Sequence, residues 1–115
     1  MTIAVLGAGM VGRAIALDLA KNYSVISFDV NESNLKMLKE KNPEIQRVVK
    51  DLKIFSSYPD FLTNIDFVVT AVPGFMGFDT LQAVINCYKN VVDISFFPDD
   101  ALQLDSLAQE NNITV

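Results

Sequence analysis

Short apolar runs recur along the chain, and the first two end at Gly7 and Asp29. Runs of this length that are rich in valine and isoleucine are typical of strands buried on both faces of a parallel sheet. A weaker strand is expected over residues 45–49, and residues 113–115 resemble the start of a sixth. The stronger runs predict strands over residues 2–6, 24–28, 66–71 and 90–96.

Segments with helical spacing of their apolar residues lie between these runs. Helices are predicted over residues 10–21, 31–41, 81–88 and 99–110, and a short one over residues 57–64 has a proline near its start. The third is expected to bury an apolar face of Leu81, Val84, Ile85 and Tyr88. The first carries an apolar stripe of Val11, Ile15 and Leu19 beside a small-residue stripe of Gly12, Ala16 and Ala20, which lets a helix approach a sheet closely.

Strand and helix therefore alternate from end to end. Together with a glycine motif after the first strand, this alternation predicts an α/β fold, a doubly wound parallel sheet of the Rossmann type with strand order 3-2-1-4-5-6. No linker or repeat divides the sequence, so residues 1–115 are expected to form one domain. Because the chain stops at the sixth strand, we expect this domain to be cut from a longer chain.

Composition narrows the classes of function. The net charge is -5, with no basic run, so the sequence lacks the footprint of a nucleic-acid binder. Histidine is absent, which excludes a histidine base, a Ser-His triad and, with only one cysteine, the usual zinc sites. The lone Cys87 predicts a small core residue and a reducing, cytoplasmic compartment. No apolar run approaches the roughly 20 residues of a membrane helix, so no membrane partner is expected.

A glycine-rich motif, GAGMVG, follows the first predicted strand directly and opens the first predicted helix. In that context the spacing is typical of a dinucleotide-binding loop. The first glycine allows the tight turn, the second lets a pyrophosphate approach the backbone, and the third lets the helix pack against the strand. The free N–H groups at the helix start then point at the phosphates. The predicted phosphate-binding residues are Gly7, Ala8, Gly9, Met10, Val11 and Gly12.

Asp29 ends the second predicted strand, about 20 residues after the first glycine, which is the spacing of the ribose-binding carboxylate in this motif. Such a carboxylate can accept hydrogen bonds from both ribose hydroxyls and repels a 2′-phosphate. The following residues, Val30 and Asn31, offer no arginine to clamp that phosphate. The sequence therefore favours NAD over NADP, with Val30 beside the ribose. The alternative is that Asp29 caps the next helix, which Asn31 or Ser33 can do instead.

Three further positions lie where the predicted strands end. Asp51 follows the weak third strand and is placed near the adenine amino group, or else in a solvated loop. The turn of Ala71, Val72, Pro73 and Gly74 is expected under the nicotinamide-side ribose, or else is an ordinary strand-to-helix turn. Ser95 and Phe96 flank the nicotinamide or pack under another part of the protein. A fourth candidate, Arg13, directly follows the glycine motif and lies near the phosphates or only on the surface.

Three blocks of this sequence resemble the saccharopine dehydrogenase family. They are residues 5–13 (VLGAGMVGR), residues 71–77 (AVPGFMG) and residues 92–96 (VDISF), the last followed by two aspartates and a helix. The resemblance implies the nicotinamide-binding part of an oxidoreductase that acts on a secondary amine linking two amino acids, and so a place in lysine metabolism. The family's substrate domain follows the sixth strand, so no catalytic residue carries over, and this chain is expected to bind cofactor without catalysing.

Two other classes of protein remain open from the sequence. One is a regulatory NAD-sensing domain of the kind that gates potassium transport, although Lys50-Asp51 stands where that class usually has Gly-Asp. The other is a Rossmann domain that has lost its ligand and serves as an interaction surface. A homodimer is also predicted, because Phe96, Phe97 and the strand edge at residues 113–115 would otherwise be exposed.

Overall fold

The computed structural model describes residues 1–94. Several expectations lie outside these residues: the end of the fifth predicted strand, the helix over residues 99–110, the sixth strand, and the positions of Ser95, Phe96 and Phe97. The fold described below is therefore that of the first five strands and the helices between them.

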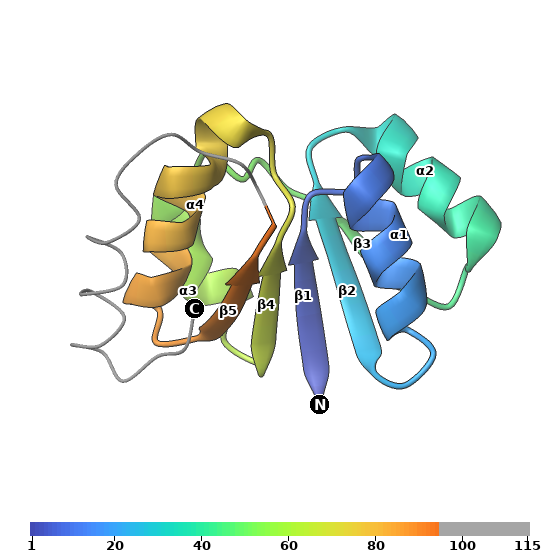
Figure 1. Ribbon diagram of the computed structural model, residues 1–115, viewed down its shortest axis with the longest axis horizontal. Coiled ribbons are helices and arrows are strands. Elements are labelled where there is room, and N and C mark those ends of the chain that lie inside the picture. The colour runs from blue at the N-terminus through green and yellow to red at the C-terminus, as the bar shows by residue number, and fades with distance from the viewer. Residues whose placement is uncertain (95–115) are drawn as a thin grey trace.

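The described strands form one parallel sheet in the order β3-β2-β1-β4-β5. Their bounds are β1 Thr2–Leu6, β2 Ser24–Asp29, β3 Gln46–Val49, β4 Phe67–Thr70 and β5 Asn90–Asp93. All strands run the same way, so their carboxyl ends share one edge, at the top of Figure 1. The doubly wound fold and the order of the first five strands are thus confirmed, with β1 at the centre of the sheet as the glycine motif requires.

Helices pack on both faces of this sheet. Their bounds are α1 Met10–Leu19, α2 Glu32–Lys41, α3 Tyr58–Phe61 and α4 Gly74–Asn86, with a 3₁₀ turn at Phe55–Ser57 before α3. Side chains of α1 and α2, such as Ala16 and Leu38, bury one face, and side chains of α3 and α4, such as Tyr58 and Val84, bury the other. None of the helices within residues 1–94 is long and apolar enough to cross a membrane.

The predicted stripe on α1 is wrong at Val11, whose side chain is 59% exposed. Gly12 and Ala16 are the buried residues of this helix, while Ile15 and Leu19 are only half-buried. The reason is close packing: a Cβ on Gly12 would overlap the carbonyl oxygen of Gly7. The small-residue stripe therefore faces the sheet, and Val11 is turned away at the start of the helix.

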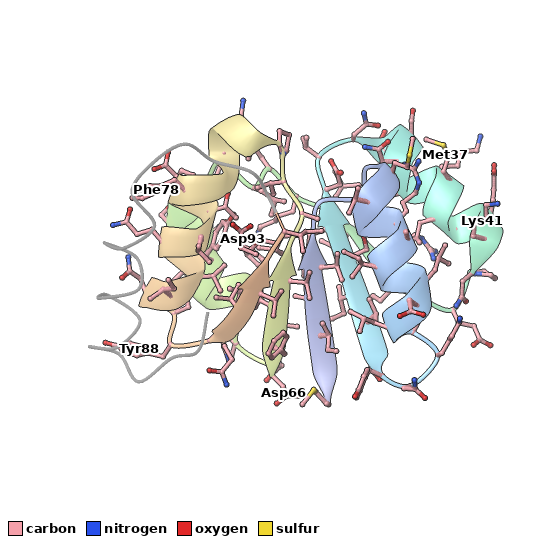
Figure 2. All side chains as sticks on the ribbon, in the orientation of Figure 1. Met37, Lys41, Asp66, Phe78, Tyr88 and Asp93 are labelled. Carbon is pink, nitrogen blue, oxygen red and sulfur yellow. The ribbon has the colours of Figure 1, made fainter. Side chains whose placement is uncertain are left out.

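The predicted apolar face of α4 is correct for Leu81, Val84 and Ile85, which are buried, and wrong for Tyr88. The helix ends at Asn86, and Tyr88 adopts a left-handed backbone with φ of 59°. This turn directs the Tyr88 ring away from the sheet, where it is 71% exposed (Figure 2). Cys87 packs against the core as expected, and burial raises the pKa of its thiol.

Candidate functional site

The glycine turn after β1 lies between the ends of β2 and β4. Gly7 has a φ of 104°, which a residue with a side chain rarely adopts. Its N–H donates to the carbonyl oxygen of Phe28 at 2.8 Å, and a Cβ at this position would overlap the carbonyl oxygen of Ala71. The turn therefore packs closely against both neighbouring strands, and only glycine fits at this position.

Open space lies over Gly9, the residue that precedes α1. A Cβ on Gly9 would meet no atom within 4 Å, in contrast to the other two glycines of the motif. No side chain caps this end of α1, and the side chains of Met10 and Val11 are exposed. The first N–H groups of the helix thus border an opening at its positive end, which is the arrangement that receives an anion such as a phosphate.

The carboxylate of Asp29 ties the glycine loop to the end of β2. Its Oδ2 accepts the N–H of Ala8 at 2.7 Å, and its Oδ1 accepts the N–H of Asn31 at 2.9 Å. The helix cap is Asn31, whose side chain accepts the N–H of Asn34 at 3.2 Å. The alternative role for Asp29 as the cap of α2 is therefore wrong, and its half-buried carboxylate lies beside the glycine loop.

Two side chains complete a closed ring of hydrogen bonds around Ala8. The Nδ2 of Asn34 lies 3.4 Å from Asp29 Oδ2, and the Nη1 of Arg13 donates to Asn34 Oδ1 at 3.3 Å. The same Nη1 donates to the carbonyl oxygen of Ala8 at 2.9 Å. The sequence left the place of Arg13 open and did not single out Asn34. The only sequence signal for Asn34 was its place as a polar residue in the first turn of the helix that follows Asp29.

A cavity of about 220 Å³ opens between the loops that follow β2, β3 and β4. This is smaller than the roughly 300–1,000 Å³ of sites that enclose a whole ligand, so it can hold one part of a dinucleotide. Asp51 lies at the cavity in a tight turn, where its Oδ1 accepts the N–H of Lys53 at 3.0 Å. The lining residues are Gly7, Asp29, Val30, Asp51, Leu52, Lys53, Val72, Pro73 and Met76.

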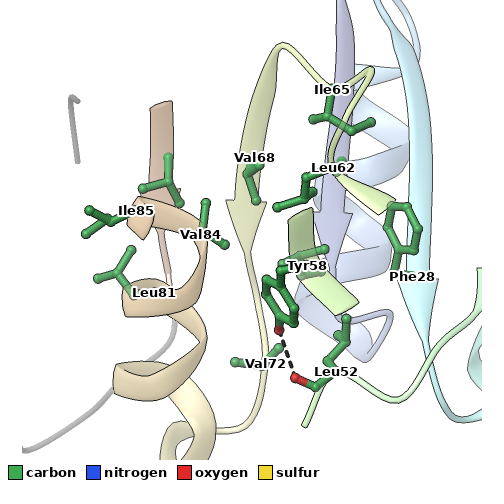
Figure 3. Close-up of a cluster of buried hydrophobic side chains, with 13 residues drawn as sticks. Phe28, Leu52, Tyr58, Leu62, Ile65, Val68, Val72, Leu81, Val84 and Ile85 are labelled. Carbon is green, nitrogen blue, oxygen red and sulfur yellow. Dashed lines mark hydrogen bonds between the residues drawn. The ribbon is translucent and has the colours of Figure 1, made fainter. Parts of the chain in front are cut away.

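A buried tyrosine supports the floor of this cavity. The hydroxyl of Tyr58 donates to the carbonyl oxygen of Leu52 at 2.8 Å (Figure 3), and the ring of Tyr58 contacts that of Phe61 at 4.8 Å between centroids. Burial raises the pKa of Tyr58 from 10.0 to about 12. No sequence pattern indicates this role of Tyr58, because it depends on a loop that the side chain meets only in the folded chain.

The turn after β4 packs against the glycine loop on its other side. The N–H of Ala71 donates to the carbonyl oxygen of Leu6 at 2.7 Å, and Val72 and Pro73 line the cavity together with Asp29. Gly74 begins α4. Further along the same edge, the hydroxyl of buried Thr70 donates to the carboxylate of Asp93, which Figure 2 labels at the end of β5. No cluster of metal-ligating side chains occurs within residues 1–94.

The parallel sheet, the glycine loop and the position of Asp29 agree with a comparison against known families. A family model described as the saccharopine dehydrogenase NADP binding domain matches residues 3–115. The chain belongs to this family. The resemblance inferred from the sequence motifs is thereby confirmed, and the chain is a nicotinamide-dinucleotide-binding domain of an oxidoreductase family. This favours the dehydrogenase interpretation over the two other classes that the sequence left open.

The individual relatives bear different names. Protein CapL of Staphylococcus aureus is 37% identical over 76 residues, which cover 62% of this chain and 18% of CapL. Apo saccharopine dehydrogenase (L-Glu forming) from Saccharomyces cerevisiae is 20% identical with a TM-score of 0.83, and the match covers 99% of this chain and 26% of that enzyme. GenD2 from gentamicin A biosynthesis, solved in complex with NAD, is 20% identical with a TM-score of 0.74, covering 99% of this chain and 33% of GenD2.

The chain thus spans a third or less of the length of these three relatives. At 20% identity, the two solved structures show the fold alone.

Proposed function

We propose that residues 1–115 form the cofactor-binding domain of a saccharopine dehydrogenase-like oxidoreductase, and that this domain binds NAD in preference to NADP. The observation that carries the proposal is the place of Asp29. Its carboxylate lies beside the open space over Gly9 and at the rim of the cavity between the loops. A dinucleotide whose ribose binds Asp29 can then extend to the space over Gly9 on one side and into the cavity on the other.

The pyrophosphate is proposed to lie over Gly9, against the N–H groups that begin α1. Asp29 then receives the adenosine ribose. A carboxylate has about four lone-pair positions, and three of those on Asp29 are taken by Ala8, Asn31 and Asn34. The remaining position is on Oδ1. We therefore expect one direct bond from a ribose hydroxyl to Asp29, where the sequence alone suggested two.

The adenine is proposed to enter the cavity bordered by Val30, Asp51, Val72 and Pro73. Its apolar walls suit a flat ring, and Asp51 is an acceptor for the exocyclic amino group. Val72 and Pro73, which the sequence placed under the nicotinamide-side ribose, are thus proposed to border the adenine instead. The nicotinamide half then continues toward Ala71, Gly74, Ser95 and Phe96, along the carboxyl edge of the sheet. These assignments follow the general rule that ligands of open α/β sheets bind where the strand order reverses.

The proposed reaction is the oxidation of a secondary amine that links two amino acids, or the reverse reduction. Oxidation removes a hydride from carbon and a proton from nitrogen, and the resulting imine is hydrolysed to an amine and an aldehyde or keto acid. When bound, the nicotinamide ring supplies the hydride acceptor or donor. This chain binds and orients the dinucleotide, and we assign it no catalytic acid or base. The family match supports this substrate class and a place in lysine metabolism.

A reducing compartment such as the cytoplasm is proposed as well, because Cys87 is the single cysteine of the sequence.

The first prediction tests the role of Asp29 by calorimetry of NAD and NADP at one salt concentration. Wild type should bind NAD at least about tenfold more tightly, equivalent to 1.4 kcal/mol. Asp29→Ala should narrow this gap, because it removes a ribose acceptor and relieves repulsion of the 2′-phosphate.

Asp66→Ala is the matched control for this experiment. The carboxylate of Asp66 also accepts a backbone N–H, from Thr2 at 2.7 Å, but at the opposite edge of the sheet. This variant should leave both affinities unchanged. Equal affinities in the wild type, or a preference that Asp29→Ala does not alter, would contradict the proposed selectivity. Failure to bind either dinucleotide would contradict the proposed function itself.

A further inference from the structure

The ring of hydrogen bonds around Ala8 brings a positive charge close to the position proposed for the ribose. Asp29 binds the N–H of Ala8, and Arg13 binds its carbonyl oxygen. Asn34 joins the two charged side chains: its Nδ2 faces Asp29 and its Oδ1 accepts from Arg13. Arg13 belongs to α1 and Asn34 to α2, so two helices together fix the guanidinium beside a carboxylate at the end of β2.

The guanidinium of Arg13 is only partly used by residues 1–94. Both of its hydrogen bonds to these residues come from Nη1. Arginine has five N–H donors in a planar fork, which leaves the Nη2 edge for a ligand. The side chain is also only half-buried, so part of it is open to a ligand. An arginine fork is the group that proteins use most often for planar, bidentate recognition of phosphate.

We propose that Arg13, held beside Asp29 by Asn34, binds the 2′-phosphate of NADP and makes this domain accept both dinucleotides. This assignment rests on the proposed function and refines its cofactor specificity. Asp29 favours the ribose hydroxyl of NAD and repels the added phosphate, whereas Arg13 offsets part of that repulsion. Asn34 is a positioning residue, because it acts on the cofactor through Arg13. The preference for NAD is therefore smaller than Asp29 alone would produce.

A purely structural role for Arg13 has a different consequence. If Arg13 only anchored the carbonyl oxygen of Ala8, its loss would loosen the glycine loop and weaken NAD and NADP by the same factor. A phosphate-binding role weakens NADP alone. The ratio of the two dissociation constants therefore separates the roles, whatever happens to the stability of the loop.

The experiment is calorimetry of NAD and NADP with the wild-type chain and Arg13→Gln. We expect Arg13→Gln to weaken NADP by about tenfold and NAD by less than about twofold, so that the preference for NAD widens. The affinity for NADP should also depend less steeply on salt in this variant, because one cation–phosphate contact is lost.

Asn34→Ala tests the positioning role. On its own it should weaken NADP by a few-fold, because Arg13 loses its side-chain partner. Combined with Arg13→Gln, it should weaken NADP no further than Arg13→Gln does alone, which is the result expected for residues that act as one unit. Full additivity of the two changes would contradict the positioning role of Asn34.

Arg47→Gln is the matched control. Arg47 also donates from one Nη1 to two acceptors, the carbonyl oxygens of Pro43 and Ile45, but it lies on edge strand β3. This variant should leave both affinities unchanged. Arg13→Lys provides a second test if Arg13→Gln does not fold, because the charge remains while the planar fork is lost. It should weaken NADP by a few-fold and leave NAD unchanged.

Three results overturn the inference. Equal weakening of both dinucleotides by Arg13→Gln, or no change in the affinity for NADP, shows that Arg13 does not bind the phosphate. Wild type that binds NAD but has no measurable affinity for NADP overturns the inference and leaves the proposed function standing. Wild type that binds neither removes the proposed function, and the inference with it.

Discussion

Gly9 and Gly12 stand in one motif, yet their surroundings in the folded chain differ. The space over Gly9 is open to 4 Å, whereas a Cβ on Gly12 would overlap the carbonyl oxygen of Gly7. Only Gly9 therefore leaves room for the proposed pyrophosphate, and Gly12 is needed for the contact between α1 and the turn that precedes it. Substitution by alanine separates the two roles.

Gly12→Ala should destabilise the fold. The added methyl group has only a backbone atom of the Gly7 turn to displace, and overpacking of this kind costs roughly 1–3 kcal/mol. Alanine's higher helix propensity, worth about 1 kcal/mol, offsets only part of that. Gly9→Ala should change the free energy of unfolding by about 1 kcal/mol or less and still weaken both dinucleotides, because its methyl group fills the space proposed for the pyrophosphate.

Urea unfolding and calorimetry of the two variants would check these expectations. A Gly9→Ala variant that binds NAD as well as wild type would place the pyrophosphate elsewhere. A Gly12→Ala variant of unchanged stability would show that α1 can move away from the turn.

Among the elements, α3 is the shortest α-helix within residues 1–94, with only four residues at Tyr58–Phe61. A helix of one turn is not stable alone in water, so tertiary packing must hold it. Tyr58 provides that packing, since it is fully buried and its hydroxyl binds the carbonyl oxygen of Leu52. The element thereby fixes the loop after β3, which forms one wall of the proposed adenine cavity.

Tyr58→Phe should lower the free energy of unfolding by about 1–3 kcal/mol, because a buried carbonyl oxygen loses its donor. The effect should also depend on pH. Burial raises the pKa of Tyr58 from 10.0 to about 12, so the folded chain keeps a proton that the unfolded chain loses in this interval. The free energy of unfolding of wild type should therefore fall as pH rises from about 10 to about 12, more steeply than that of Tyr58→Phe.

Urea unfolding at several pH values checks this prediction. Tyr88→Phe is the matched control, since the ring of Tyr88 is 71% exposed and its hydroxyl should contribute little. Parallel curves for wild type and Tyr58→Phe across this pH interval would show that the phenol is not held in its neutral form by burial.

For the whole molecule, the sequence predicts association into a homodimer. The apolar residues behind that prediction, Phe96, Phe97 and the edge at residues 113–115, lie outside residues 1–94, so it stays a prediction. Sedimentation of the wild-type chain should show a dimer that weakens at low concentration.

Ile113→Lys should weaken this dimer, because a charge on the expected edge strand opposes pairing with a second copy. Val49→Lys is the control, since Val49 is 53% exposed on β3 at the opposite edge of the described sheet. A monodisperse monomer of the wild type at every concentration would contradict the prediction.

The sequence by itself determined the alternation of strands and helices and the central place of the strand before Gly7. It also determined that Asp29, at the end of the second strand, belongs to the same site as the glycine loop. These features depend on short-range patterns: apolar runs that must be buried on both faces, and a loop whose glycines follow a strand directly. The strand limits agree with the prediction to within two residues for β1 to β4.

Only the tertiary structure decided which side chains meet across elements. Val11 and Tyr88 fit their helical patterns, yet the close approach of α1 to the sheet and the left-handed turn after α4 leave both exposed. Arg13 and Asn34 are 21 residues apart in the chain, and their hydrogen bond forms only where α1 and α2 pack together. No local pattern encodes such a contact, because it depends on the packing distance between two helices.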